Sequence, residues 1–579
     1  CGDLHLLRVL PERPVPLHHL HRRVLDVDPR AAAGDGGGHS VLACAADAGK
    51  RGTGGCYIPS QKSESRRGPL IGWRFFDGFF DDFFVSISPL ELPRKCSVYR
   101  TRIKGIFMNC NVLILGAGPA GMSAALSLLN TNVNFSVIEK ENAVGGLAKT
   151  IPFGPFLLDI GPHILCTKPY VYDYNPKVYG LIEELLGADL SLYETLNRKY
   201  LETVHVGGDK FDYPIQIKNA LQNVGFAQAL HMVFDYIGAK SQSAHNSDEN
   251  LSFEQIMTTQ LGRSLADLFI LKYSEKTWGL KCSALSSDLA WRVGEFSMMA
   301  VLIEQFSNFW KNLRSQSGHP VCYPTQGIGA ICEKIKVDIE KTSIGEVKTD
   351  SYPISILHGD GCIYEVTVCE RGVIRSYHPN YILSSIPISQ LIQLLDPKPP
   401  AEVIDSVLNL KHRSHLCLYL IVNKSHVLKE HCIYYPDPEI PFARMMEQKN
   451  YSQATCPGNT TALAIEFFCW YGDDLWNADD SELFRIAISR LEELNIVREG
   501  EIVDYFVHRE RYAYPVYDLG YGDRLRTVNA YLSGLKNLKL IGRSGTFTYM
   551  GQYRAMEAGS NAADEIVSEL LKKSSGGLA

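Results

Sequence analysis

The most regular hydrophobic pattern of the chain lies between residues 111 and 139. Asn111 to Leu115 is a short apolar run, Ala120 to Leu129 carries apolar residues at helical spacing after a glycine-rich turn, and Phe135 to Glu139 is a second apolar run. Short apolar runs bounded by turns are typical of buried strands, and a period of about 3.6 residues indicates a helix. The pattern predicts a strand–turn–helix–strand unit, which is typical of the α/β fold class.

Further along the chain the pattern changes between helical and strand periods. Residues 171–310 are predicted to be mainly helical, with amphipathic stretches at Val178–Leu186 and Phe253–Tyr273. Residues 343–385 alternate in short segments separated by the turn His358–Gly361, which predicts strands. The remaining predicted elements are strands within 412–470, a helix at Ser481–Leu494 and a last helix at Arg554–Lys572.

Residues 1–107 differ in composition from the rest of the chain. A small-residue run, Ala31 to Gly38, and an aromatic patch, Trp73 to Phe84, show neither a helical nor a strand period. Such a segment lacks the periodic apolar faces that a core of its own would need. We expect the natural protein to begin at Met108, with residues 1–107 disordered or a non-native leader. A functional tail is the alternative.

Composition and charge restrict the class of protein. The 579 residues suffice for two or three domains, and 45% hydrophobic with 21% charged residues is the balance of a globular chain. A net charge of −6 argues against nucleic-acid binding, which needs a clustered excess of Lys and Arg. The best candidate for a membrane span, Val112 to Leu129, is interrupted by three glycines and a proline, so we expect no transmembrane segment.

The 15 cysteines show no spacing of the kind that binds a metal ion. A disulfide framework is typical of small secreted domains, and this chain is much larger. We therefore expect free, mostly buried thiols in a reducing compartment, which predicts a cytoplasmic protein without a metal ion.

The turn between the first predicted strand and helix carries a GxGxxG motif, formed by Gly116, Gly118 and Gly121. The first glycine permits a tight turn, the second lets the backbone approach a pyrophosphate, and the third allows close helix–strand packing. Pro119 and Ala120 begin the helix, whose N-terminal N–H groups attract phosphate. Glu139 ends the second strand and is placed to accept hydrogen bonds from ribose hydroxyls. The unit predicts a dinucleotide site without separating FAD from NAD.

A second glycine motif follows Glu139. The two stretches that continue it are Gly145-Gly146-Leu147-Ala148-Lys149-Thr150 and Asp159-Ile160-Gly161-Pro162-His163. Here the chain resembles the large flavoprotein superfamily that includes amine oxidases, protoporphyrinogen oxidase and UDP-galactopyranose mutase. The resemblance implies FAD, held by a Rossmann-type, glutathione-reductase-like domain, and an inserted α+β substrate domain. The alternative for the double glycine is a flexible turn.

In that superfamily the acid and the double glycine enclose the FAD pyrophosphate. The resemblance therefore adds Lys140, Gly146, Leu147 and Gly161 to the expected cofactor contacts. Family members often carry Arg just after the double glycine, whereas this chain has Leu147 there and Lys149 two places later.

The C-terminal end predicts the second half of the cofactor site. Leu538 to Ile541 is a predicted strand that leads into Gly542 and Arg543, and Gly551 precedes the last helix. The N-terminus of that helix would bring partial positive charge to reduced, anionic flavin. We expect both ends of the chain to converge on one FAD. An ordinary strand–loop–helix ending is the alternative.

Four stretches resemble UDP-galactopyranose mutase, in the order in which that family carries them. They are Gly161-Pro162-His163-Ile164 with Thr167, Tyr273-Ser274-Glu275-Lys276-Thr277-Trp278-Gly279 with Arg292 downstream, Pro441-Phe442-Ala443-Arg444-Met445-Met446-Glu447, and Tyr514-Pro515-Val516 followed by Gly542-Arg543-Ser544-Gly545-Thr546-Phe547-Thr548-Tyr549. The whole resemblance runs from about Asn111 to Ala563.

The resemblance implies roles for these residues. Arg292 and Arg444 would clamp a diphosphate, since guanidinium groups make planar, bidentate contacts with phosphate oxygens. His163 would tune the flavin by hydrogen bonding. The expected catalytic residues are His163, Arg292, Arg444 and Tyr549, and the substrate-binding residues are Tyr273, Trp278, Arg292, Arg444, Tyr514 and Tyr549. From residue type alone, such arginines are more often found in structural salt bridges, and residues such as Tyr273 and Trp278 more often pack in the core.

The chain departs from the mutase pattern at Gly551, where that family usually carries an acid. We therefore predict an FAD-dependent oxidoreductase in which substrate hydride passes to flavin N5. A mutase-like isomerase that uses reduced FAD on a sugar nucleotide is the alternative, and a flavin-binding scaffold without turnover is a third interpretation. The partner is a small molecule, which would be a nucleotide sugar in the isomerase.

We expect two domains, each assembled from separate segments of the chain. The FAD-binding domain comprises residues 108–170, 325–400 and 535–575, and the substrate domain comprises residues 171–324 and 401–534.

Overall fold

The computed structural model describes residues 107–108, 110–131, 133–166, 174–192, 202–213, 223–243, 251–292 and 321–576. Residues Tyr99–Ala579 form one compact unit, which contains all of these described residues. The expectation for residues 1–107 therefore lies outside the described residues, apart from Phe107.

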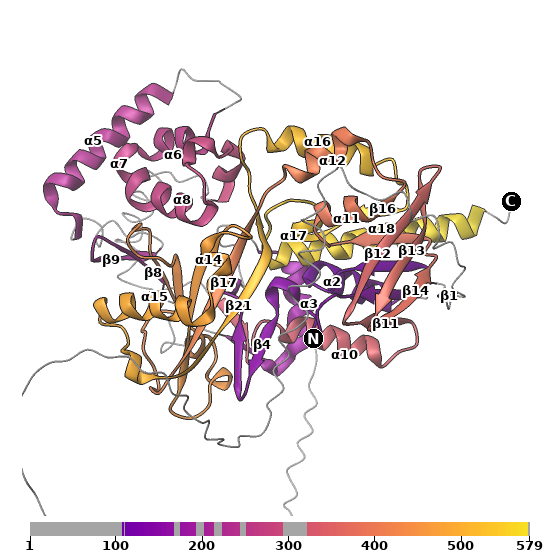
Figure 1. Cartoon of the computed structure of the whole chain (residues 1–579), viewed down its shortest axis with the longest axis horizontal. Coiled ribbons are helices and arrows are strands. Elements are labelled where there is room, and N and C mark those ends of the chain that lie inside the picture. Colours follow the sequence, from indigo (N-terminus) through magenta and orange to yellow (C-terminus); the bar gives the residue numbers. More distant parts are fainter. Residues whose placement is uncertain are drawn as a thin grey trace, which may run out of the picture. The chain divides into compact units, whose positions relative to one another are not determined.

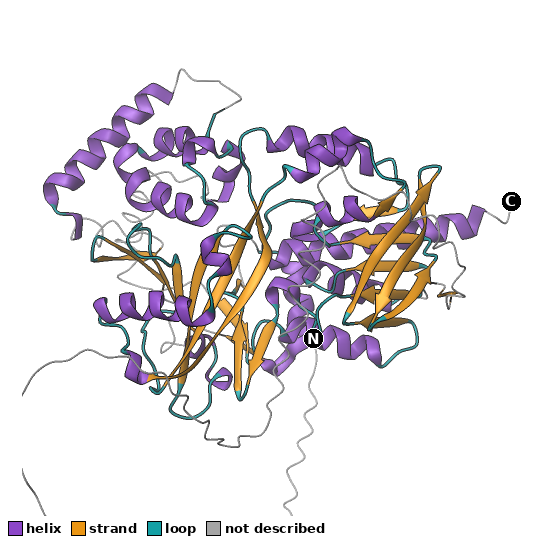
Figure 2. Ribbon diagram, in the orientation of Figure 1, coloured by secondary structure: helices purple, strands orange, loops and turns teal. Residues whose placement is uncertain are grey.

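A five-stranded, all-parallel sheet forms the middle layer of this mixed α/β unit (Figures 1 and 2). Its strands, in spatial order, are β11 (Gly345–Lys348), β3 (Phe135–Ile138), β2 (Val112–Leu115), β15 (Tyr381–Ser384) and β22 (Leu538–Leu540). The three central strands are buried along their whole length, which suits their continuous apolar sequences. The predicted strand–turn–helix–strand unit is confirmed as β2, α2 (Pro119–Leu129) and β3.

Helices cover one face of the parallel sheet, and a mixed sheet, antiparallel only between its three central strands, covers the other. Val112 and Ile114 pack into a core shared with α2, α10 (Ala330–Glu340) and α18 (Gln552–Gly576), whereas Leu113 and Leu115 pack towards the second sheet. That sheet has the order β1 (Phe107–Met108), β14 (Val373–Tyr377), β13 (Cys362–Glu370), β12 (Ser351–Gly359) and β16 (Leu395–Asp396). The strands predicted within 343–385 are thus confirmed.

A seven-stranded sheet lies beside these layers (Figures 1 and 2). Its order is β21 (Ile502–Pro515), β17 (His412–Val422), β20 (Thr461–Cys469), β19 (Arg444–Glu447), β18 (Cys432–Tyr434), β8 (Glu202–Val206) and β9 (Asp209–Tyr213). Neighbouring strands are antiparallel except for β18 and β8.

Side chains alternate between the two faces of the seven-stranded sheet. Leu416, Leu418 and Leu420 share a core with α15 (Asp480–Glu493), the helix predicted at Ser481–Leu494. Cys417, Tyr419 and Ile421 instead belong to the core that contains α2 and the parallel sheet. The second face of this sheet is therefore turned towards the nucleotide half of the unit.

The prediction that 171–310 is mainly helical is wrong for β8 and β9. These strands carry polar residues at alternate positions and meet at Gly207 and Gly208, a two-glycine hairpin turn. The helices that the structure describes in this region are α3 (Pro176–Leu186), α5 (Phe226–Ser243), α6 (Phe253–Leu261), α7 (Arg263–Ala266) and α8 (Lys272–Trp278).

The amphipathic stretch Phe253–Tyr273 is not one α-helix. Gly262 has φ of +76° and ends α6, and a Cβ there would lie 2.8 Å from the Tyr236 backbone nitrogen of α5. Five residues of π-helix, Asp267–Leu271, then lead into α8. The break at Gly262 therefore separates α6 from a continuous helical stretch that contains α7, the π-helix and α8.

The remaining elements are short. The strands are β4 (Thr150–Phe153), β5 (Phe156–Asp159), β6 (Leu165–Cys166), β7 (Leu190–Leu192) and β10 (Val321–Pro324), and the helices are α11 (Ile388–Leu394), α12 (Ala401–Leu408), α13 (Gln448–Tyr451), α14 (Asp474–Asn477), α16 (Tyr521–Leu532) and α17 (Gly542–Gly545). The last predicted helix is confirmed as α18, which starts two residues earlier than Arg554.

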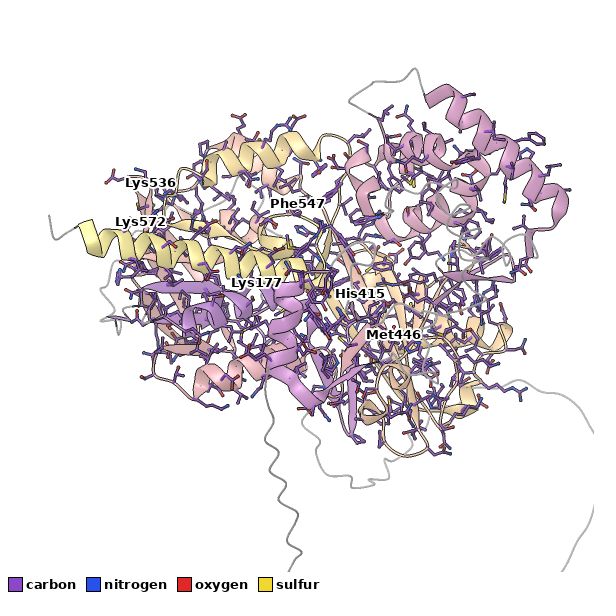
Figure 3. The ribbon with its side chains drawn as sticks, turned by 180° about the vertical axis from the view of Figure 1, so that it is seen from behind. Lys177, His415, Met446, Lys536, Phe547 and Lys572 are labelled. Atoms are coloured by element: carbon purple, nitrogen blue, oxygen red, sulfur yellow. The ribbon has the colours of Figure 1, made fainter. Side chains whose placement is uncertain are left out.

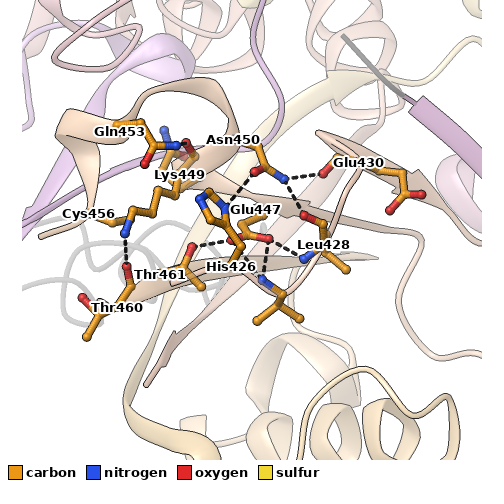
Figure 4. A network of polar contacts seen from close by, with 12 residues as sticks. His426, Leu428, Glu430, Glu447, Lys449, Asn450, Gln453, Cys456, Thr460 and Thr461 are labelled. Carbon is orange, nitrogen blue, oxygen red and sulfur yellow. Dashed lines mark hydrogen bonds and ion pairs between the residues drawn. The ribbon is translucent and has the colours of Figure 1, made fainter. Parts of the chain in front are cut away.

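A buried carboxylate organises the loop before β18 (Figure 4). Glu447 is fully buried and accepts hydrogen bonds from the backbone N–H groups of Val427 and Leu428 and from the Thr461 hydroxyl. His426 lies 3.3 Å from the same carboxylate and is partly exposed. The group explains why a glutamate is tolerated inside this sheet, because each buried oxygen has a donor.

The cysteines that the structure describes are free, and most of them are buried, as predicted. Among the described residues, no helix combines the length and apolar character that crossing a bilayer requires.

The contact between α2 and α18 leaves no room for a side chain at Gly559. A Cβ on Gly559 would lie 1.9 Å from the Ala120 carbonyl oxygen. Gly559→Ala should therefore destabilise the protein by about 1–3 kcal/mol, the usual cost of overpacking. Gly180→Ala is the matched control, since Gly180 lies in α3 with no atom within 4 Å of its added Cβ. Thermal unfolding midpoints test this, and equal midpoints for the two variants would contradict the close packing.

Candidate functional site

The turn between β2 and α2 is shaped by its glycines. Gly116 has φ of +98°, and a Cβ on Gly121 would lie 1.9 Å from the Gly116 carbonyl oxygen. Gly118 caps α2, and Pro119 is the first helical residue. The predicted tight turn and close helix–strand packing are both present, so the free N–H groups of α2 are presented by a bare backbone.

Glu139 follows β3 and is buried beside this turn. One carboxylate oxygen accepts a hydrogen bond from the Ala117 N–H at 2.7 Å, and the other accepts from the Glu141 N–H at 3.0 Å. Each oxygen has a second lone pair, so the carboxylate can still accept from a ligand hydroxyl. Lys140, next in sequence, is exposed and lies 3.2 Å from the Glu141 carboxylate.

The double glycine lies against the first motif. Gly145 has φ of +110° and donates its N–H to the Ala117 carbonyl at 2.8 Å, and a Cβ on Gly118 would lie 3.9 Å from the Gly146 Cα. Gly146 begins a short 3₁₀ helix, Gly146–Ala148, which includes Leu147. Lys149 is largely buried and lies 3.8 Å from Glu141. Two glycine segments thus leave one continuous strip of backbone without side chains.

The C-terminal segment reaches the same place. A Cβ on Gly542 would lie 3.0 Å from the Ala120 Cβ, and Gly542 has φ of +69°. Arg543 donates to the Met550 carbonyl at 2.7 Å and to the Ala513 carbonyl at 3.2 Å, which holds the loop that leads to Gly551. Gln552 opens α18, and its buried Nε2 has no hydrogen-bond partner among the described residues.

The segment Gly161–His163 is held in place by a buried carboxylate. Asp159, at the end of β5, accepts hydrogen bonds from Thr150 at 2.6 Å and from the Tyr323 hydroxyl. Burial raises the pKa of Asp159 to about 6 in spite of these hydrogen bonds. Gly161 then turns with φ of +80°, and burial lowers the pKa of the His163 imidazole to about 4. His163 is therefore neutral at neutral pH.

The seven-stranded sheet presents a buried ion pair to this segment. Arg444 on β19 donates to Glu466 on β20 at 2.5 Å, and His415 on β17 lies 2.8 Å from the same Glu466 oxygen. A Cβ on Gly161 would lie 3.1 Å from that oxygen. His415 and Met446 lie on this sheet in the view from behind (Figure 3).

The environment of Glu466 determines its charge. Burial alone would raise the pKa of this fully buried carboxyl, but the Arg444 charge and the His415 hydrogen bond lower it to about 2. Glu466 is therefore ionised, and His415 donates through Nε2 because a carboxylate only accepts.

Most of the predicted aromatic residues gather around Arg444 and Arg543. Arg444 donates to the Tyr514 hydroxyl at 3.3 Å, and the rings of Tyr514 and Tyr549 stack with centroids 5.8 Å apart. Trp278 meets Tyr514 edge-on at 5.9 Å, and Arg543 lies 4.7 Å over the Tyr549 ring. Segments more than two hundred residues apart in sequence thus meet in one cluster.

Two buried cations hold α8, which carries Tyr273 and Trp278, against the sheet. Arg413 of β17 donates to the Thr277 carbonyl at 3.1 Å, and thereby satisfies the C-terminal end of α8. The Lys276 ammonium, with three N–H donors, lies within hydrogen-bonding distance of four carbonyls, those of Tyr435, Asp437, Ile440 and Phe442, at 2.6 to 3.2 Å. Burial lowers the pKa of Lys276 to about 8. Tyr273 lies 5.6 Å from the Tyr434 ring.

Two of the quoted residues lie outside what the structure describes. Arg292 is the last residue of a 3₁₀ helix, and the position of its side chain is not described. Thr167 lies outside the described residues. Three residues of the cluster were missed, namely Glu466, His415 and Gln552. The signal for Glu466 is its position as the one charged residue in a nine-residue strand that is buried along its whole length.

The residues present fit a flavin dinucleotide. Two runs of glycine leave backbone free to approach a pyrophosphate, a buried acid lies beside them, and an unpartnered amide of Gln552 opens α18. In the second cluster, Arg444 donates to the Tyr514 hydroxyl and the Tyr549 ring stacks on Tyr514.

The buried ion pair of Arg444 and Glu466 should contribute measurably to the free energy of unfolding. Glu466→Gln should cost about 3–5 kcal/mol at neutral pH, because Arg444 would keep its buried charge without a counter-charge. The folded-state pKa of Glu466, about 2, is below its ordinary value of 4.5, so its contribution is present above about pH 4.5 and is lost as the pH falls towards 2. The difference in urea unfolding free energy between wild type and variant should shrink over that range.

Glu493→Gln provides the control for this variant. Glu493 pairs with Arg490 on the surface of α15, and exposed pairs contribute about 1 kcal/mol or less. If Glu466→Gln changed the unfolding free energy no more than Glu493→Gln, the burial and charge of the pair would be misassigned.

Comparison with known proteins agrees with this geometry. The sequence profile of the family described as "Flavin containing amine oxidoreductase" matches residues 119–567, which is more than half of the chain. A phytoene dehydrogenase from Streptomyces griseus is 42% identical over 52 residues, which span 9% of this chain and 10% of that protein.

Solved structures share the fold at low sequence identity. A reduced UDP-galactopyranose mutase superposes with a TM-score of 0.64 at 18% identity, covering 80% of this chain and 94% of that one. A protein described as a protoporphyrinogen oxidase, from Exiguobacterium sp. 255-15, gives 0.59 at 17% identity and covers 79% and 98%. Putrescine oxidase with bound putrescine gives 0.52 at 14% identity and covers 80% and 100%. The chain therefore belongs to the family of flavin-containing amine oxidoreductases, and its cofactor is FAD.

Proposed function

We propose that the protein is an FAD-dependent oxidoreductase whose small substrate carries an anionic group. The Arg444 cluster carries the proposal, because it brings a cation and aromatic hydroxyl groups to the Gly161–His163 segment. Bound FAD supplies a hydride acceptor at N5 or, when reduced, a nucleophile for an isomerisation.

The proposed cofactor site is a glutathione-reductase-like, Rossmann-type domain of residues 108–170, 325–400 and 535–575. The backbone at Gly116, Gly118, Gly121 and Gly146 would hold the pyrophosphate, with Pro119, Ala120, Lys140 and Leu147 beside it. Glu139 would accept from the ribose hydroxyls. Gly161, His163, Gly542, Arg543 and Gly551 would surround the ring system. Residues 171–324 and 401–534 would form the substrate domain, and the free buried thiols favour the cytoplasm as the compartment.

Charge at the cluster favours an anion over a cation. Arg444 and Arg543 carry two positive charges and Glu466 one negative charge, while His163 is neutral at neutral pH, which leaves the group at +1. A diamine such as putrescine would be repelled, whereas a carboxylate or phosphate would be attracted. Tyr273, Trp278, Tyr514 and Tyr549 would orient the rest of the substrate and exclude water.

His163 would act as a neutral hydrogen-bonding group. Its Nε2 lies 3.1 Å from the Ile160 carbonyl, and burial keeps the ring uncharged at neutral pH. A neutral imidazole that donates to a carbonyl with one nitrogen can accept a hydrogen bond at the other. It would therefore position a proton near the substrate without adding positive charge.

The isomerase is the second candidate. It is favoured by the sequence stretches around Tyr273, Trp278 and Arg444, which resemble those of the mutase. In that reaction Arg292 and Arg444 would clamp the diphosphate of a nucleotide sugar. Gly551 argues against it, because an acid is expected at that position in the mutase pattern. A scaffold without turnover would bind FAD that no substrate reduces.

Binding of FAD can be tested at Gly118 without disturbing the protein. A Cβ there has no protein atom closer than 3.9 Å, so Gly118→Ala should leave the thermal midpoint of the apoprotein unchanged. If a pyrophosphate lies on this backbone, the methyl group should weaken FAD binding by about tenfold or more. Fluorescence titration of apoprotein with FAD measures this, with Gly238→Ala on α5 as the control. Unchanged FAD affinity would remove Gly118 from the site.

The two reactions differ in their requirement for reduced flavin. Anaerobic mixing of the oxidised protein with protoporphyrinogen, which bears carboxylates, should bleach the flavin absorbance, and putrescine should not. Arg444→Gln should slow bleaching at low substrate by about tenfold or more, since charge-assisted contacts contribute about 1.5–3 kcal/mol.

The isomerase is tested by mixing dithionite-reduced protein with UDP-galactopyranose. Interconversion with the furanose isomer would overturn the oxidoreductase proposal, and an Arg292→Ala variant would then be expected to lose UDP affinity. Bound FAD that responds to neither substrate would favour the scaffold.

A further inference from the structure

A cavity of about 390 Å³ lies beyond the C-terminal end of β21, where α16 and the segment before α18 meet a short 3₁₀ helix, Ser287–Arg292. Its volume falls in the range of about 300 to 1,000 Å³ in which proteins bind small molecules. Its lining includes Asp288, Tyr517, Tyr521, Leu525, Phe547 and Thr548. No residue assigned to the flavin or to the proposed substrate is among them.

Three aromatic rings line this cavity. Tyr517 and Tyr521 stack with centroids 4.4 Å apart and planes 7° from parallel. The ring of Phe547, which is labelled in Figure 3, lies 6.4 Å from each of them. The faces of aromatic rings carry negative charge density, so they attract cations as well as contacting apolar groups. The rings therefore favour a ligand that combines a positive charge with apolar surface.

Asp288 carries the only formal charge among the described residues that line the cavity. Tyr521 donates to its Oδ2 at 2.8 Å, and the Ser286 hydroxyl donates to the same oxygen at 3.1 Å. Two hydroxyl groups thus fix the carboxylate beside the rings, while its Oδ1 has no hydrogen-bond partner in the part of the chain that the structure describes. A carboxylate in this position attracts a cation and repels an anion.

Two cations near the cavity are paired with a different acid. Arg524, the neighbour of Leu525 in α16, contacts the Asp518 carboxylate, and Lys411 lies 3.4 Å from the same group. Asp518 does not line the cavity. Among the described residues no lysine or arginine forms an ion pair with Asp288, so its charge remains available to a ligand.

The cavity shares one segment of the chain with the Arg444 cluster. Thr548 lines the cavity, and the next residue, Tyr549, stacks on Tyr514 in the cluster. The Tyr549 N–H donates to the Tyr517 hydroxyl at 2.7 Å, so one ring of the cavity also holds the backbone of the cluster. Arg444 does not line the cavity. The two sites are therefore adjacent but are formed by different side chains.

We propose that this cavity is a second ligand site, which binds a small alkylated ammonium ion. Asp288 supplies the opposite charge, the three rings contact the methyl groups over which the positive charge is spread, and Leu525 adds apolar surface. The ligand has the opposite charge to the proposed substrate. The inference goes beyond the proposed reaction and does not depend on it, because no residue of the proposed substrate site takes part.

The test uses the FAD-loaded full chain and choline chloride, with sodium chloride at equal ionic strength as the reference. The neutral counterpart of choline is 3,3-dimethylbutan-1-ol, which has a carbon atom in place of the charged nitrogen. Ligand-observed NMR titration should give an affinity about fivefold or more weaker for the neutral molecule. Asp288→Asn should weaken choline binding by about fivefold or more. Asp523→Asn, which breaks an exposed ion pair with Arg526 in α16, is the control and should leave choline binding unchanged.

Two variants of Tyr521 test the contribution of the rings. Tyr521→Phe keeps the ring and should retain the choline affinity within about twofold, whereas Tyr521→Leu should weaken it by about fivefold or more. The proposal is overturned if choline does not bind, if it binds no better than its neutral counterpart, or if either Asp288→Asn or Tyr521→Leu leaves its affinity unchanged. Choline binding that is weakened in Arg444→Gln also overturns it, because the ligand then occupies the Arg444 cluster.

Discussion

Backbone contact between the two ends of the chain is the constraint on which this structure depends. The α2 and α18 helices approach so closely at Gly559 and Ala120 that no methyl group fits between them. At Gly542 the chain again touches Ala120. Because the glycine turn at Gly116 leads directly into α2, this contact brings the C-terminal loop to the cradle that two glycine motifs form. The proposed cofactor site forms only once residues more than four hundred positions apart have packed together.

The other side of the site follows from alternation in the seven-stranded sheet. On β17, β19 and β20 one face is mainly apolar and shares a core with α15, and the opposite face carries His415, Arg444 and Glu466 into the interior. A buried charge is costly unless it is paired, and here an arginine and a carboxylate pair across adjacent strands. The sheet is therefore both a structural layer and the source of the charges in the proposed substrate site.

The sequence predicted those parts of the fold that depend on local pattern. The strand–turn–helix–strand unit at 111–139, the strands of 343–385, and α15 and α18 all follow from periodicity and glycine turns. The strands β8 and β9 were missed because their polar alternation is weak outside the context of a sheet. Gly262 was missed because its positive φ is imposed by the nearby α5 backbone, a tertiary contact.

The same distinction applies to the site. Glycines, Arg444 and the tyrosines were predicted from motifs, and the structure brings them to one region, although their roles remain proposals. Neither His415 nor Glu466 is part of a recognisable sequence motif. Their contact with each other and with Arg444 depends on the register that pairs β17 with β20 and β20 with β19. Register is set by turns and by the burial of one face, which local composition does not reveal.

The four carbonyls around the Lys276 ammonium have a mechanical consequence. They replace its hydration shell, so α8 and the segment from Tyr435 to Phe442 are coupled as a single body. Any displacement of that segment would carry Tyr273, one turn earlier on the same helix, along with it. Part of the proposed substrate site is thus tied to the segment that the Lys276 ammonium holds.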